Sequence, residues 1–185
     1  VDGLRLFLGN DLARGIGAVD LKYKSYHYDF KTNTQFYDWN SNIFADIFWE
    51  SNPRYSRDKD SGSFKVAADF SKYDELKFET SSVIFESFAD RILEVNVNIP
   101  EELAKLKYEL KFFIDSTPPN RLQWISDVSE PFKITKSGWN TFRYKWRGKS
   151  VSGNLDCIRG FGVRLERPKS APAWKGDLYF DDIRW

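Results

Sequence analysis

Apolar and polar residues alternate along much of this chain with a period of two. The longest such run, 106–115, places five apolar residues on one face: Leu106, Tyr108, Leu110, Phe112 and Ile114. The run 92–99 does the same with Leu93, Val95, Val97 and Ile99. Because successive side chains of a β-strand point to opposite faces of its sheet, each run predicts a strand with one buried face.

Shorter alternating runs follow at 139–146, 161–165 and 178–180. Turn-forming residues separate the runs, among them Ser-Gly at 61–62 and 137–138 and Pro-Pro-Asn at 118–120. Only Glu101–Lys107, directly after Pro100, favours a helix. Many short strands with turns between them predict an all-β fold, an antiparallel β-sandwich of the jelly-roll type.

The first 22 residues differ from the rest, because four glycines interrupt their short apolar runs. We interpret 1–22 as a leading strand or an interdomain segment and 23–185 as the β-sandwich. A chain of 185 residues fits one such domain. It begins at Val1 without a methionine, so we expect it to be part of a larger, secreted, extracellular protein.

Charge and composition narrow the choice of partner. The formal net charge is only +1, so nothing supplies the excess of cations on which nucleic-acid binding depends. No apolar run is long enough to span a membrane. Aromatic residues make up 17% of the chain, more than one core needs, although the mean hydropathy is −0.56. These features favour a neutral partner, and we expect a monomer.

Catalytic chemistry finds little support in the sequence. A jelly-roll glycosidase needs two carboxylates within about 5–10 Å of each other. The candidate glutamates are scattered without a paired motif: Glu50, Glu79, Glu86, Glu94, Glu109 and Glu166. The only histidine, His27, has no nucleophile motif beside it, and Cys157 stands at the start of an apolar strand. We therefore predict that the chain is not an enzyme.

Several aromatic residues stand in polar, turn-rich segments that core packing explains poorly. These are Trp49, Tyr73, Trp124 and Trp174, and the polar neighbours that could bind sugar hydroxyls are Glu50, Glu75, Arg121 and Gln123. A flat aromatic ring can pack on the apolar C–H face of a sugar. Any one of these rings is explained equally well as half-buried packing, but all four together are not. Three further tryptophans, Trp139, Trp146 and Trp185, stand in regular strand patterns, and we expect them in the core.

Five segments, in order, resemble landmarks of jelly-roll carbohydrate-binding modules. Residues 28–39 resemble their opening "F-D-F-E-x-G-x-x-x-W", and 62–66 resemble the "G-x-x-A-L-x-V" strand. Residues 92–100 are similar to "L-x-x-D-I-Y-I-P", 138–141 to "G-W-N-T", and 176–185 to the closing "G-x-I-Y-I-D-D/N-V-x-L". The order and spacing most resemble the mannan-binding family 27, while families 4, 11, 16 and 22 share most of the landmarks.

This resemblance implies a non-catalytic module that binds a plant cell-wall β-glycan, with β-1,4-mannan as the leading candidate. It places Trp49, Tyr73 and Trp124 at the three aromatic positions of family 27 and implies a covalently linked glycoside hydrolase as partner. It also implies a structural calcium held by Asp29 and Asp181, although Lys31 stands where a Glu is common. The alternatives are a structural or interaction β-sandwich of a secreted multidomain protein and a divergent jelly-roll glycosidase.

Overall fold

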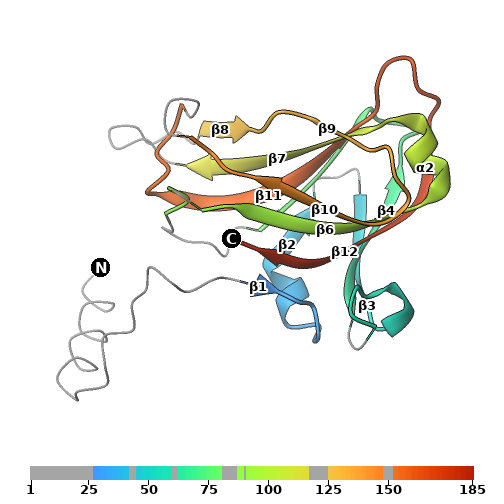
Figure 1. The fold of residues 1–185 in the computed structure, drawn as a ribbon, viewed down its shortest axis with the longest axis horizontal. Helices are drawn as coiled ribbons and strands as arrows, with labels where there is room; N and C mark the ends of the chain where they lie inside the picture. The colour runs from blue at the N-terminus through green and yellow to red at the C-terminus, as the bar shows by residue number, and fades with distance from the viewer. Residues whose placement is uncertain are drawn as a thin grey trace.

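The computed structural model describes residues 27–41, 45–59, 62–80, 87–89, 91–116, 125–147 and 152–185. Two antiparallel sheets face each other, and Figure 1 shows β7 and β11 of one sheet above β6 and β12 of the other. The predicted all-β sandwich is confirmed. The segment 1–22 lies outside the described residues. No helix in the described ranges is long and apolar enough to cross a membrane.

We call the first sheet sheet A. Its strand order is β10 (Gly138–Tyr144), β6 (Leu93–Ile99), β12 (Lys175–Arg184), β4 (Ser63–Asp69) and β3 (Ala45–Glu50). The short strand β1 (His27–Tyr28) also pairs with β12. Strand β12 therefore joins segments that are far apart in the sequence.

The second sheet, sheet B, has the order β2 (Trp39–Ser41), β5 (Glu75–Thr80), β11 (Ile158–Glu166), β7 (Glu109–Ser116) and β8 (Ile125–Val128). Strand β9 (Phe132–Lys133) pairs with β7. The outward side chains of the central strands form ion pairs, including Lys111 with Glu166 at 2.6 Å and Lys77 with Glu79 at 2.8 Å. Sheet B therefore presents a charged, self-paired outer surface.

Among the described residues, three short helical segments connect the strands: η2 (Gln35–Asp38), η3 (Pro53–Tyr55) and α2 (Glu101–Leu106). The predicted helix after Pro100 is confirmed, and it ends where Lys107 adopts a left-handed conformation with φ of 56°. That ending changes the strand predicted at 106–115, because Leu106 closes the helix and β7 begins only at Glu109.

Aromatic rings fill the space between the sheets. Phe64 on β4 is fully buried, and its ring centroid lies 5.3–6.2 Å from five others: Phe30, Phe36, Trp39, Phe78 and Phe180. Trp146 and Trp185 are buried in the same core, as the sequence predicted. Trp139 is absent from this core, because the register of β10 turns it to the other face.

Removing the Phe64 ring tests how far the fold depends on this cluster. Phe64→Ala leaves a cavity among five rings and should lower the free energy of unfolding by about 3–5 kcal/mol. Urea unfolding followed by tryptophan fluorescence measures the loss. Tyr37→Ala, which removes a largely exposed ring, should change it by about 0.5 kcal/mol or less. Equal stability of the two variants would contradict the central position of Phe64.

Candidate functional site

The outer face of sheet A presents a row of side chains that crosses five strands. The pairing register aligns one residue from each strand: Trp139, Asn98, Tyr179, Lys65 and Phe48. Phe48 is 49% exposed, and Trp139 and Tyr179 are partly exposed. We call this set the aromatic row. Neighbouring strands lie about 4.8 Å apart, so the row is about 19 Å long.

The connection between β3 and β4 adds a fourth ring to this surface. Asn52 caps the helical turn η3 by accepting a hydrogen bond from the Arg54 N–H at 3.0 Å, and Tyr55 follows. The Tyr55 and Tyr179 rings are stacked, with centroids 4.3 Å apart and planes 8° apart. Burial, assisted by the nearby Asp177 carboxylate, raises the pKa of Tyr179 to about 12. Its phenol therefore stays protonated and can donate a hydrogen bond.

A polar row lies beside the aromatic row. The register aligns Thr141, Asn96 and Asp181. The Thr141 hydroxyl donates to Asn96 Oδ1 at 2.5 Å, and Asn96 Nδ2 donates to the Asp182 carbonyl at 3.0 Å. The amide of Asn96 is thus fixed in one orientation. Asn96 is 1% exposed and Asp181 is 3% exposed, so Thr141 is the member of this row that is open to a ligand.

Asp181 lies under the loop that follows η3. Its carboxylate accepts hydrogen bonds from the backbone N–H groups of Arg57 and Asp182, both at 2.8 Å. Burial raises the pKa of Asp181 to about 6, and these two hydrogen bonds oppose that rise. Asp182 in turn pairs with Arg57 and His27. The network ties the β3–β4 loop to the outer face of sheet A.

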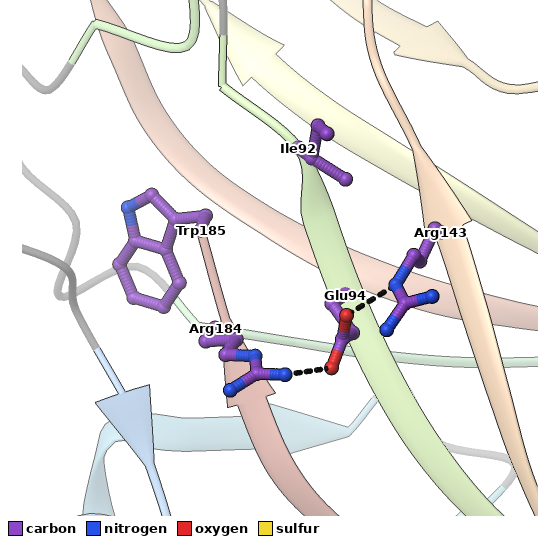
Figure 2. Close-up of a pocket in the computed structure, with 5 residues that line it drawn as sticks. All are labelled: Ile92, Glu94, Arg143, Arg184 and Trp185. Atoms are coloured by element: carbon purple, nitrogen blue, oxygen red, sulfur yellow. Dashed lines mark hydrogen bonds and ion pairs between the residues drawn. The ribbon is translucent and has the colours of Figure 1, made fainter.

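At the end of β12 this face contains a pocket of about 270 Å³. Figure 2 shows its five lining residues: Ile92, Glu94, Arg143, Arg184 and Trp185. Glu94 lies between the two arginines and pairs with both. Burial alone would raise the pKa of Glu94, but the hydrogen bonds from Arg143 and Arg184 outweigh it and lower the pKa. Glu94 is therefore ionised at neutral pH.

The structure places two of the sequence-predicted tryptophans in packing positions. Trp49 on β3 pairs with Phe64 and points inward, and its indole N–H donates to the Phe30 carbonyl at 2.9 Å. Trp174 is only 8% exposed and packs in the core, next to the Tyr108 hydroxyl that bonds its backbone N–H. Little of the Trp174 ring is open to a ligand, and Trp49 is partly buried against the core. Their positions agree with the alternative that these two residues serve packing.

The other predicted binding residues are spread over the molecule. Glu50 lies on the outer face of sheet A, where its carboxylate accepts a hydrogen bond from the Asn52 N–H at 2.9 Å. Tyr73 is exposed in the turn after β4, at the end of that strand opposite to Trp49. Glu75 lies on sheet B, 3.4 Å from Arg164. The triad Arg121, Gln123 and Trp124 lies outside the described residues.

Sequence reasoning missed most of the aromatic row. Phe48 stands beside Trp49 and Tyr179 beside Phe180, and each neighbouring ring hides which of the two takes the outer face. Trp139 could have been found, because the alternation that sends Phe142 and Tyr144 inward sends Trp139 outward. Core packing was predicted for Trp139, and its partial exposure on the outer face corrects that prediction.

The two acids that the resemblance assigns to calcium have other partners in the structure. Asp29 accepts a hydrogen bond from the Lys31 N–H at 3.3 Å and lies 3.8 Å from the Lys31 ammonium. Asp181 uses its carboxylate for two backbone N–H groups. Within the ranges that the structure covers, no group of three or more His, Cys, Asp or Glu side chains could hold a metal ion. Calcium stays a prediction from the resemblance.

Solved structures resemble this chain in fold. No family model and no curated protein matches the sequence. The chain is similar to the structure of the family 22 carbohydrate-binding module and GH10 modules of Clostridium thermocellum endo-1,4-β-D-xylanase 10B, complexed with xylohexaose. That match has a TM-score of 0.61 and 11% identity, and covers 88% of this chain and 28% of the xylanase chain.

Two single modules match over most of their own length. The xylan-binding family 22 module CBM22-2 of Paenibacillus barcinonensis Xyn10C has a TM-score of 0.53 and 12% identity, over 85% of this chain and 96% of that one. The family 11 module of the Clostridium thermocellum cellulosomal cellulase Lic26A-Cel5E has a TM-score of 0.54 and 14% identity, over 86% and 92%. These similarities show that the chain has the β-sandwich fold of carbohydrate-binding modules.

The pairing of Glu94 with two arginines predicts a dependence of stability on pH. Because folding lowers the pKa of Glu94, its contribution is present above the ordinary glutamate pKa and is lost as the pH falls through the folded value. Glu94→Gln should therefore destabilise the protein at pH 7 by about 1 kcal/mol, since both arginines are half exposed. The difference from wild type should shrink in acid.

Thermal melts of both proteins from neutral to acidic pH measure this effect. Glu130→Gln removes the same charge from an exposed position and serves as the control. A Glu94→Gln difference that stayed constant across the pH range, or that matched the control, would contradict the assigned role of Glu94.

Proposed function

We propose that this chain is a non-catalytic carbohydrate-binding module that binds a β-glycan along the outer face of sheet A. The observation that supports this most directly is the aromatic row, which places three rings and two polar side chains in line across five strands. Rings can contact the C–H faces of successive sugars, and each contact adds about 0.5–1.5 kcal/mol beyond area burial. A row about 19 Å long suits an oligosaccharide better than a single sugar.

The polar groups around the rings fit the same ligand. Asn98 and Lys65 stand between the rings, and the exposed Thr141 lies one row away. Sugar hydroxyls donate and accept hydrogen bonds, and these side chains supply both kinds of partner. The fold supports the same proposal, because the three similar structures described above contain carbohydrate-binding modules, and two of these structures are described as xylan-binding or bound to xylohexaose. Fold similarity by itself does not assign function.

Two carboxylates of this face, Asp181 and Glu94, lack the properties of a glycosidase general acid. A general acid needs a raised pKa and access to the substrate. Burial raises the pKa of Asp181, but Asp181 is 3% exposed. Glu94 borders an open pocket, but its two arginines lower its pKa. Neither carboxylate combines both properties. The rival reading, a structural β-sandwich, would require another protein to cover the aromatic row.

We further propose that the module is a monomer that tethers a covalently linked extracellular glycoside hydrolase to its substrate. Tethering raises the effective concentration of the catalytic domain near the polysaccharide without adding a new contact. The glycan is a β-1,4-linked plant polysaccharide in this proposal. The resemblance to family 27 favours mannan, and the similar solved structures favour xylan.

Native affinity electrophoresis through galactomannan, glucomannan, xylan, mixed-linkage β-glucan and xyloglucan tests the proposal. We expect retardation by at least one β-glycan. Trp139→Ala and Phe48→Ala should each weaken that retardation about fivefold to tenfold, because each removes one stacking contact. Tyr37→Ala removes an exposed ring elsewhere and should leave retardation unchanged.

Two further variants compare this surface with the sequence-based placement. If Tyr73→Ala and Trp124→Ala abolish retardation while Trp139→Ala does not, the glycan binds at the loops and not along the aromatic row. Unchanged migration of the folded wild-type protein in every gel would contradict carbohydrate binding and support the structural rival. Retardation only by mannans would support the family 27 reading, and retardation only by xylan would exclude it.

The implied calcium is tested separately, by thermal melting. If calcium binds the folded protein through Asp29 and Asp181, adding it to chelator-treated protein should raise the Tm. A free calcium concentration of about 100 times the Kd would stabilise the folded state by about 2.7 kcal/mol. Magnesium, which prefers a tighter octahedral site, should have a smaller effect. Asp29→Asn should remove most of the calcium effect, and a Tm that does not respond to calcium would contradict the site.

A further inference from the structure

In the pocket at the end of sheet A, Arg143 and Arg184 have more hydrogen-bond donors than the Glu94 carboxylate accepts from. Arg143 is 63% exposed and Arg184 is 48% exposed in their side chains. Each guanidinium has five N–H donors. Glu94 accepts from Nε of Arg143 and from Nη2 of Arg184, and in the described part of the chain neither arginine side chain has another partner. Most of their donors are therefore available to a ligand.

The charge of the pocket is positive. Two guanidinium groups face one carboxylate, and the lowered pKa of Glu94 keeps that carboxylate ionised at neutral pH. The nearest acid along β12, Asp182, is already paired with Arg57 and His27. One unit of positive charge therefore remains. Forked guanidinium donors match the geometry of a carboxylate, which they can bind with two parallel hydrogen bonds.

The remaining walls of the pocket are apolar. Ile92 is half exposed, and Trp185, which is 7% exposed, lines the pocket with the edge that it leaves open. Such walls suit the C–H groups of a sugar ring. The single carboxylate of Glu94 also holds both arginines in place before any ligand arrives, which reduces the entropy lost on binding. The pocket thus combines a preorganised cationic side with apolar walls.

We propose that this pocket binds the carboxylate of a uronic acid residue of the glycan, with Arg143 and Arg184 as its donors. This inference rests on the proposed function, because it assigns an acidic sugar to the surface already described. Glu94 and Asn98 are four residues apart on β6, so the pocket lies about 14 Å from the aromatic row. A bound oligosaccharide can span that distance. The uronic acid is then a residue of the glycan main chain or of one of its branches.

NMR titration with two small sugars tests the pocket independently of the identity of the main-chain glycan. The probes are methyl β-D-glucuronide and methyl β-D-glucoside, which differ in the carboxylate. We expect the Nε–H signals of Arg143 and Arg184 to shift with the glucuronide, which should bind about tenfold more tightly than the glucoside, the effect of one charge-assisted hydrogen bond. Equal binding of both sugars, or no shift of either arginine, would overturn the proposal.

Variants assign the preference to the two arginines. The double variant Arg143→Gln/Arg184→Gln should reduce the preference for the glucuronide to about twofold or less. Arg143→Lys/Arg184→Lys keeps the positive charges and the partners of Glu94 but loses the forked guanidinium donors. It should also lose most of the preference for the glucuronide over the glucoside. Lys72→Gln removes one exposed positive charge near the opposite end of sheet A and should change nothing. A preference that survives in both arginine variants would overturn the assignment.

Two outcomes separate this inference from its alternatives. Sodium acetate that shifts the same arginine signals at the same concentration as the glucuronide would show a general anion site and overturn the sugar assignment. Retardation of the protein by a neutral β-glycan, together with failure of the glucuronide test, would leave the proposed function standing and remove only the uronic acid. Glucuronide binding without retardation by any glycan would support the pocket and contradict the aromatic row.

Discussion

The pairing of β12 with two neighbours that come from distant parts of the sequence determines the geometry of the whole molecule. Its backbone bonds to β4 on one side and to β6 on the other, and β1 pairs with its end. Leu178 and Phe180 point into the core, while Tyr179 and Asp181 point to the outer face. A change in the register of this strand would disrupt the core, the aromatic row and the pocket together.

Core and surface are linked because a strand has only two faces. On β10, Phe142 and Tyr144 pack against Phe132 in the interior, and this requires Trp139 and Arg143 to face outward. The same rule on β6 buries Val95 and Val97 and exposes the edge of Asn98. The outer surface is therefore positioned by packing forces that do not involve its own residues. This is how an aromatic row can be rigid and still remain open to solvent.

The sequence predicted the strands and the sandwich because alternation and turn residues are local signals. The helix at Glu101–Leu106 and the buried positions of Trp146 and Trp185 were also predictable for this reason. The surface was harder to predict. Trp49 stands in a polar sequence context, yet it packs inward because β3 pairs with the buried Phe64. Tyr55 joins Tyr179 only through the fold of a loop, and strand order, which no local pattern contains, aligns Phe48 with Trp139.

An irregularity near the end of β12 separates the two parts of this surface. The register shifts between Asp181 and Arg184, and Asp182 takes a left-handed conformation with φ of 49°. One additional residue is thereby accommodated, so Ile183 still reaches the core and Arg184 still reaches the pocket. The bulge therefore lies between the aromatic row and the pocket. Substitutions on the pocket side can change the shape and charge of the pocket while the register of the aromatic row stays as it is.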